Sequence, residues 1–87
     1  MAIAPVVNIN GTSKRDLIDQ NLEAWRAVKA AFGALAEAAP HPRDFQTVQD
    51  PTVLAQARVD HKYRLHQLNK IASELEEIAI KIQEQGR

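Results

Sequence analysis

The chain has 87 residues, with eleven basic and eleven acidic side chains and no cysteine. This length allows one small domain, and the lack of cysteine excludes disulfides and thiolate metal sites as sources of stability. The balanced charge gives no pull toward nucleic acid or a membrane surface, and no segment approaches the roughly 20 apolar residues that span a bilayer. No secretory leader is recognisable at the N-terminus, so we expect a soluble cytoplasmic protein.

Residues 1–12 predict an extended arm. β-branched residues dominate this segment, and Pro5 blocks a helix. The Asn10-Gly11 pair signals a turn, after which Thr12 or Ser13 can cap a helix; counted from Ser13, Asp16 falls at the third helical position. Four apolar residues in an arm imply that it packs on its own hairpin or on a neighbouring molecule.

A first helix is expected over residues 14–39, about 39 Å long. Its bulky apolar face holds Leu17, Trp25, Val28, Phe32 and Leu35. A second apolar face is a row of small residues at steps of three and four, namely Ala24, Ala27, Ala31, Ala34 and Ala38. Two apolar faces need two partners, and the chain offers only one other helix. The pattern therefore predicts a homo-oligomer that associates through the alanines.

Two residues of this helix carry further interpretations. Asn21 falls within the bulky face, where it would either fix the register of a helix pair or point to solvent near the helix start. Gly33 costs about 1 kcal/mol of helix stability relative to alanine, which suggests a close backbone approach at this position.

The connection over residues 40–50 begins with Pro40-His41-Pro42, which ends the first helix. It is longer than the two to eight residues common between antiparallel helices. A functional loop would explain its Arg43, Asp44 and Phe45. The alternative is that Phe45 closes the end of the hairpin while Arg43 and Asp44 form local bonds.

A second helix is expected over residues 51–85, about 52 Å long, with Asp50 as its cap and Pro51 at its first position. Its apolar stripe is interrupted by His61 and Arg64 and consists of Leu54, Ala57, Leu65, Leu68, Ala72, Leu75, Ala79 and Ile82, widened by Ile71 and Ile78. A smaller face on the opposite side holds Val59, Tyr63 and His66. The first half of the helix is basic and the last part acidic, so two antiparallel copies would place basic over acidic.

These elements predict an all-α fold, a long antiparallel two-helix hairpin (13–87) with an extended N-terminal arm (1–12) that forms a coiled-coil-like oligomer. The end of the longer second helix must then pack on the arm or on another protomer.

The sequence carries no signature of catalysis or of a cofactor. His61 and His66 are five residues apart and point about 140° apart on a helix, so they cannot share a metal ion without a third element. No nucleophile motif, phosphate loop or dinucleotide fingerprint occurs. We therefore expect a non-enzymatic protein without metal or cofactor.

Basic and aromatic residues near the loop form the candidate ligand site: Arg43, Phe45, Arg58, His61, Lys62, Tyr63 and Arg64, with His41 beside them. Arginine binds phosphate oxygens in a bidentate manner and aromatic rings stack on bases, so these side chains suit an anion that carries a ring. The alternative is structural. Arg64 and His61 would then flank the apolar stripe and make bonds between helices, and Tyr63 would lie in an interface.

Three segments resemble a group of small phage and prophage proteins: Asn10-Gly11-Thr12-Ser13, then Pro40-His41-Pro42-Arg43-Asp44-Phe45, then Ala57-Arg58 with His61 and Arg64-Leu65. The likeness extends from about residue 8 to residue 82. That group has no settled activity, so the resemblance implies a viral origin and a location in the host cytoplasm.

The segment from Asp50 to Arg58, followed by Leu65 and Leu68, is also similar to helical-hairpin phage proteins that sequester nucleotide second messengers of bacterial immunity. Those proteins are small helical oligomers that hold a ligand between protomers with basic and aromatic side chains, and Arg58 is the matched arginine. The first helix and the longer loop depart from that family.

The resemblance favours a phage-encoded anti-defence protein that sequesters a cyclic nucleotide or another nucleotide signal. The alternative is a protein-binding inhibitor of a host defence complex, or a phage assembly or structural module. DNA binding is not expected, because the basic half of the second helix holds only four Lys or Arg residues and precedes an acidic half.

Overall fold

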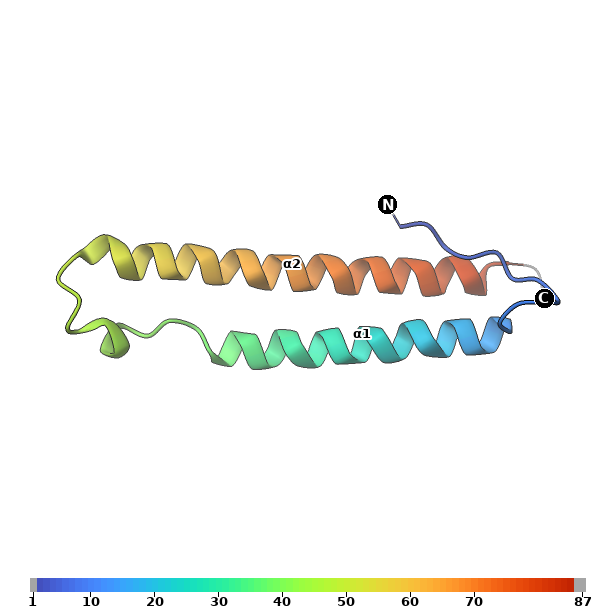
Figure 1. Ribbon diagram of the computed structural model, residues 1–87, viewed down its shortest axis with the longest axis horizontal. Helices are drawn as coiled ribbons and strands as arrows, with labels where there is room; N and C mark the ends of the chain where they lie inside the picture. The colour runs from blue at the N-terminus through green and yellow to red at the C-terminus, as the bar shows by residue number, and fades with distance from the viewer. Residues whose placement is uncertain (1, 86–87) are drawn as a thin grey trace.

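The computed structural model describes residues 2–85 and has two long helices side by side in antiparallel directions (Figure 1). Helix α1 spans Lys14–Glu37 and helix α2 spans Pro51–Gln83, joined through a short 3-10 helix, η1, at Pro42–Phe45. The molecule measures 62 × 20 × 17 Å, and residues 2–85 contain no strand. The predicted helical hairpin with an extended arm is therefore confirmed.

The helix boundaries differ slightly from those predicted. Helix α1 ends at Glu37 instead of residue 39, and α2 ends at Gln83 instead of residue 85. The predicted arm and hairpin also included Met1, Gly86 and Arg87, which lie outside the described residues.

Both helices begin at the predicted caps. The Ser13 hydroxyl accepts a hydrogen bond from the backbone amide of Asp16 at 3.1 Å. The Asp50 carboxylate accepts bonds from the hydroxyl and the amide of Thr52 at 2.7 and 2.9 Å, and these bonds lower its pKa. Pro51 occupies the first helical position, where no amide is needed. Both helix starts are thus specified by local sequence.

The two helices pack along the predicted apolar faces. All five residues of the bulky face of α1 are half-buried, and most of the α2 stripe is buried or half-buried. The most buried part lies near the C-terminal end of α2, where Ala72, Ala79 and the fully buried Ile82 gather. Ile71 is exposed, so it does not widen the stripe as predicted. The core is therefore narrow and concentrated at the end where the arm joins.

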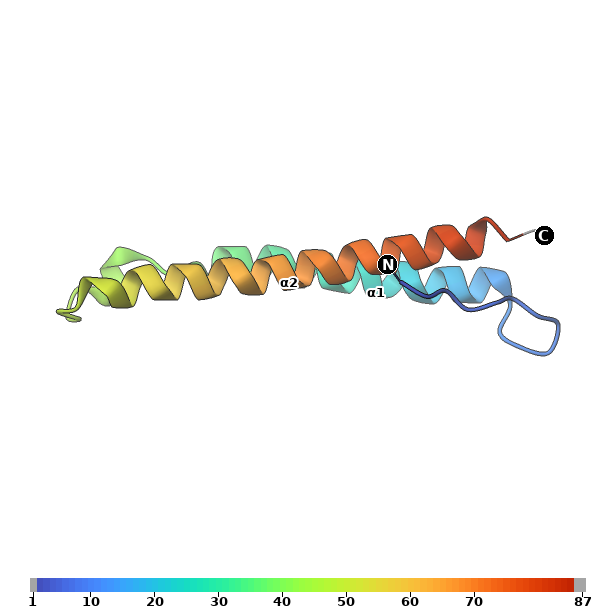
Figure 2. The ribbon, with the colours of Figure 1, turned by 90° about the horizontal axis from the view of Figure 1, so that it is seen from above.

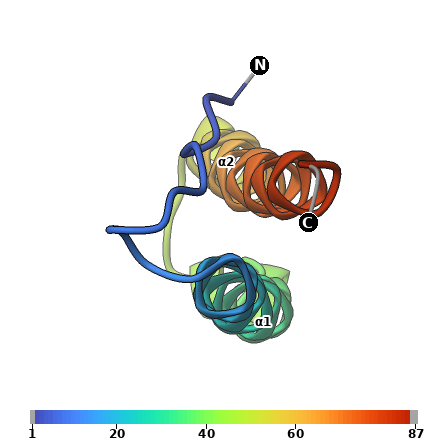
Figure 3. The same ribbon diagram turned by 90° about the vertical axis from the view of Figure 1, so that its right-hand side faces the viewer.

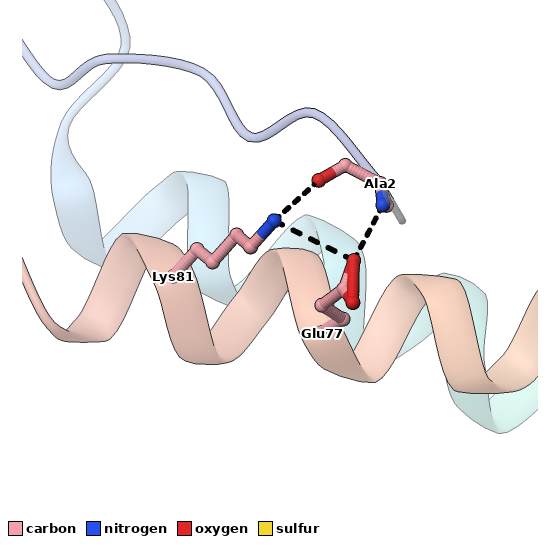
Figure 4. Close-up of polar contacts among 3 residues, drawn as sticks. All are labelled: Ala2, Glu77 and Lys81. Atoms are coloured by element: carbon pink, nitrogen blue, oxygen red, sulfur yellow. Dashed lines mark hydrogen bonds and ion pairs between the residues drawn. The ribbon is translucent and has the colours of Figure 1, made fainter.

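The arm lies along the C-terminal part of α2, as the views from above and from the end show (Figures 2 and 3). Its backbone is held by long polar side chains of that helix. The amide of Ala2 donates to the Glu77 carboxylate, and the Lys81 ammonium donates to the carbonyl oxygen of Ala2 at 2.7 Å (Figure 4). Gln85 accepts from the amide of Val7 and donates to the carbonyl oxygen of Pro5, both at 2.8 Å. The arm thus packs on its own hairpin.

Only one side of the arm is covered. Ala2 is buried, whereas Ile3, Val6 and Ile9 expose 93%, 78% and 97% of their surfaces. Ile3 and Val6 belong to the extended segment, and Ile9 lies in the turn that follows it. We call these three exposed residues the outer row of the arm.

Asn21 and Gly33 both lie on α1. The half-buried Asn21 amide donates to the carbonyl oxygen of Leu17 at 2.8 Å, within its own helix, and its role in fixing register stays a prediction. A Cβ added at Gly33 would meet nothing within 4 Å. No segment of the described protomer approaches Gly33 closely.

Within residues 2–85, neither helix has a window long and apolar enough to cross a membrane.

Candidate functional site

The predicted alanine interface lies on the surface of the protomer. Ala24 is half-buried at the edge of the helix pair, and Ala27, Ala31, Ala34 and Ala38 are exposed. We call these five residues the alanine face. At about 100° per residue, this face is centred about 90° around the helix from the bulky face that contacts α2, with Ala24 at the shared edge. The alanine face therefore has no partner in the described protomer.

The predicted ligand residues point in several directions. Residues 61–64 are consecutive on α2, and at about 100° per residue they sweep around most of the helix. Lys62 borders one hollow and Tyr63 borders another on a different face. Arg58 and Arg64 are exposed. One protomer thus does not gather these side chains around a common point.

His61 is buried inside the hairpin, with 6% of its surface exposed. It lies in the α2 stripe between Ala57 and Leu65, at steps of four. Its Nε2 atom is buried and has no hydrogen-bond partner in the described part of the chain. The sequence interpretation treated His61 as an interruption of the stripe, but the histidine occupies a core position there.

The loop residues form local structure. The Nδ1 atom of His41 accepts a hydrogen bond from the amide of Arg43 at 3.1 Å, and the His41 carbonyl oxygen accepts from the amide of Asp44 at 3.0 Å. These bonds build η1. Phe45 is half-buried, while Arg43 remains exposed. Arg43 is therefore available to a ligand, and His41 already serves as a cap.

A hollow between the two helices brings together residues that the sequence did not group. It is lined by Phe32 of α1 and by Lys62, Leu65, His66 and Asn69 of α2. The ammonium of Lys29 lies 5.6 Å from the centre of the Phe32 ring, within cation–π range. The sequence placed Phe32 in the core, and only the pairing of α1 with α2 reveals that it borders a hollow beside two lysines.

A second hollow runs along one face of α2 and is lined by Tyr63, His66, Gln67, Lys70, Ile71 and Glu74. We call it the α2 groove. All six residues are spaced along a single helix, and Tyr63 and Ile71 are among the exposed large apolar side chains. The sequence identified part of this face through Val59, Tyr63 and His66, which are all exposed.

In residues 2–85, no group of three or more histidine, aspartate or glutamate side chains is arranged to hold a metal ion.

Comparisons with known proteins return no matching family model, no matching curated protein and no matching solved structure.

Proposed function

We propose that this protein is an assembly module, a helical hairpin that associates with copies of itself and acts by binding instead of catalysis. The observation that carries the proposal is how much surface one protomer leaves uncovered. It exposes 6706 Å², whereas a compact chain of this mass would expose about 5,100 Å². Its radius of gyration is 18.8 Å, against about 12 Å for a compact domain of this length.

The excess surface of one protomer is about 1,600 Å². This is roughly twice the 800 Å² or so that each partner buries in a standard protein interface. Part of the exposed apolar surface is the alanine face, of which four alanines are uncovered, and part is the three large residues of the outer row of the arm. Association of copies would cover both.

The alanine face suits an antiparallel copy of α1. Ala24 and Ala38 lie seven residues on either side of Ala31, and Ala27 and Ala34 lie four and three residues from it, so a two-fold axis near Ala31 would place Ala24 opposite Ala38 of the second copy. Side chains this small allow two helices to approach closely. Gly33, which has open space around it, imposes no obstacle to that approach.

Charges beside the alanine face complement this arrangement. Arg26 and Glu37 lie on the same flank of α1, five and six residues on either side of Ala31. The two-fold axis would therefore bring Arg26 near Glu37 of the second copy, twice in the dimer. Within the protomer, Arg26 pairs with Glu23 at 3.4 Å in an exposed position, which contributes little.

Sedimentation velocity over a range of concentrations tests the proposal. Ala31→Glu should dissociate the alanine-face dimer, whereas the control Ala36→Glu, on an exposed alanine of another face, should leave the mass unchanged. Arg26→Glu should weaken association, and adding Glu37→Arg should restore it. A wild-type protein that stays monomeric at all concentrations would overturn the proposal.

A nucleotide ligand is a second candidate function, because the hollow between the helices offers a ring and cations together. Phe32 supplies an aromatic surface, Lys62 lines the same hollow, and the Lys29 ammonium lies close to the Phe32 ring. This composition suits a base with attached phosphates. The exposed Arg43 and Arg58 could join the site only from the loop end or from a second protomer.

Native mass spectrometry of protein purified from cells with an active nucleotide-signalling defence tests this candidate. A bound mass of nucleotide size, released on denaturation, is the expected result. Lys62→Gln should weaken binding of the same nucleotide in calorimetry, while the control Arg15→Gln, at the opposite end of the hairpin, should not. If no mass is added and no heat of binding is measured, the nucleotide-binding hypothesis is wrong and the assembly module is the remaining proposal.

A further inference from the structure

The outer row of the arm is the most exposed large apolar surface of the chain. Ile3, Val6 and Ile9 stay exposed although the backbone of residues 2–7 is held against α2 by Glu77, Lys81 and Gln85. All four bonds between the arm and these side chains use backbone atoms of the arm. The side chains of the row are therefore left free for another contact.

The α2 groove continues the face on which the arm lies. Seven residues follow one another at steps of three or four, and so share one side of the helix: Tyr63, Gln67, Lys70, Glu74, Glu77, Lys81 and Gln85. The last three hold the arm, and the first four line the groove. The groove and the arm-binding residues thus form one continuous strip along α2. The arm covers the part at Glu77, Lys81 and Gln85, and the part from Tyr63 to Glu74 is open.

We propose that the arm of a second copy fills the α2 groove, with its outer apolar row against Tyr63 and Ile71. A two-fold axis close to Glu74 would place the segment 77–85 of the second copy, with its arm, over residues 63–71. The same operation places the first arm in the second groove. Two identical contacts form at once, and each copy contributes the residues that complete the other.

The lengths of the two parts agree. The groove extends from Tyr63 to Glu74, eleven residue steps of helix or about 16 Å. The bonded part of the arm runs from Ala2 to Val7, and its five steps of extended chain also span about 16 Å. The axis near Glu74 also brings Lys70 opposite Glu77 of the second copy, so basic and acidic groups face each other across the contact.

This inference rests on the self-association proposed above, but it uses a different face of the hairpin. The alanine face lies on α1, whereas the groove and the arm lie on α2. A chain with two different two-fold contacts can build a larger closed or open assembly, and each contact can be removed separately.

Disulfide cross-linking tests the arm contact, because the natural chain has no cysteine. In the double variant Val6→Cys/Tyr63→Cys, the two thiols lie far apart within one copy. Val7 is bonded to Gln85, which is 22 residues, or about 33 Å, along α2 from Tyr63. A disulfide needs Cα atoms within about 7 Å, so only two copies can form it.

Mild oxidation should convert most of the double variant to a covalent dimer on a non-reducing gel, while each single variant and the control pair Val6→Cys/Ala36→Cys stay monomeric. The link should persist when Ala31→Glu is added. Failure to cross-link, in a protein whose mass still falls on Ala31→Glu, would overturn the arm contact and leave the alanine-face dimer. Cross-linking together with no effect of Ala31→Glu would support the arm contact and overturn the alanine face.

Discussion

The backbone amide of Ala2 donates a hydrogen bond to the carboxylate of Glu77, a residue 75 positions further along the chain. Lys81 completes the contact, because its ammonium reaches both the Ala2 carbonyl oxygen at 2.7 Å and the Glu77 carboxylate at 3.6 Å. The hydrogen bond from the Ala2 amide, together with the positive charge of Lys81, lowers the pKa of Glu77 below its ordinary value. The ionised carboxylate is therefore the form that fastens the arm.

Acidification should release the arm. Because the pKa of Glu77 is lowered in the folded state, its contribution is fully present above the ordinary glutamate pKa of about 4.3 and is lost as the pH falls through the lowered value. Amide hydrogen exchange and NMR shifts of residues 2–7, followed from pH 7 to pH 3, report this release.

Glu77→Gln is the matched variant, since it keeps the size of the side chain and removes its charge. The arm should be loose at every pH in this variant, and the acid transition of residues 2–7 should disappear. Asp50 also has a lowered pKa, but it caps the other end of α2. An arm that loosens in acid to the same extent in Glu77→Gln would contradict the role of this carboxylate.

Ile82→Ala should be the most damaging truncation in the hairpin. Ile82 is fully buried, so the loss of its side chain leaves a cavity and should lower the free energy of unfolding by about 2–5 kcal/mol. Ile80→Ala, two residues away and 50% exposed, serves as the control and should cost much less. Urea denaturation at one fixed protein concentration compares the two.

His61→Leu should stabilise the hairpin. The Nε2 atom of His61 is buried without a partner among the described residues, and such an unsatisfied group costs about 1–3 kcal/mol. Leucine fills a similar volume and carries no polar atom, so thermal unfolding should shift upward. His66→Leu, at an exposed position of the same helix, should have little effect. A loss of stability in His61→Leu would mean that the histidine is hydrogen-bonded in solution.

Asp50→Ala should fray the start of α2. The Asp50 carboxylate bonds both the amide and the hydroxyl of Thr52, and removal of such a cap costs about 1 kcal/mol. Circular dichroism and thermal unfolding should show a small loss of helix and stability at neutral pH. The Asp50→Asn variant, which retains a capping oxygen, should lose less.

The helices could be predicted because their signals are local. Ser13, Asp50 and Pro51 specify where helices begin, and the spacing of apolar residues specifies the sides that pack. Both observed helix ends lie two residues short of the predicted boundaries, since frayed last turns have no comparably strong signal.

The candidate sites were less accessible to sequence reasoning, because they depend on which helix lies beside which segment. The charges of residues 58–64 suggested one cluster, but a helix turns these side chains in different directions. The spacing placed His61 within the apolar stripe and His66 on the opposite face, but it left open whether His61 was buried or reached a ligand. The hollow at Phe32 and Lys62 requires the register of α1 against α2, and the role of Glu77 requires the path of the arm.

The path of the arm also sets an order of events in folding. The helices and their hairpin depend on contacts that can form progressively from the loop, whereas the arm contacts join residues 75 or more positions apart. The hairpin brings the start of α1 beside the end of α2, where Lys14 donates to the carbonyl oxygen of Gln85, so the arm should dock last, after the hairpin has formed. Residues 2–7 leave the ribosome before α2 exists. Their apolar side chains therefore stay exposed until the last turns of α2 have been synthesised and folded.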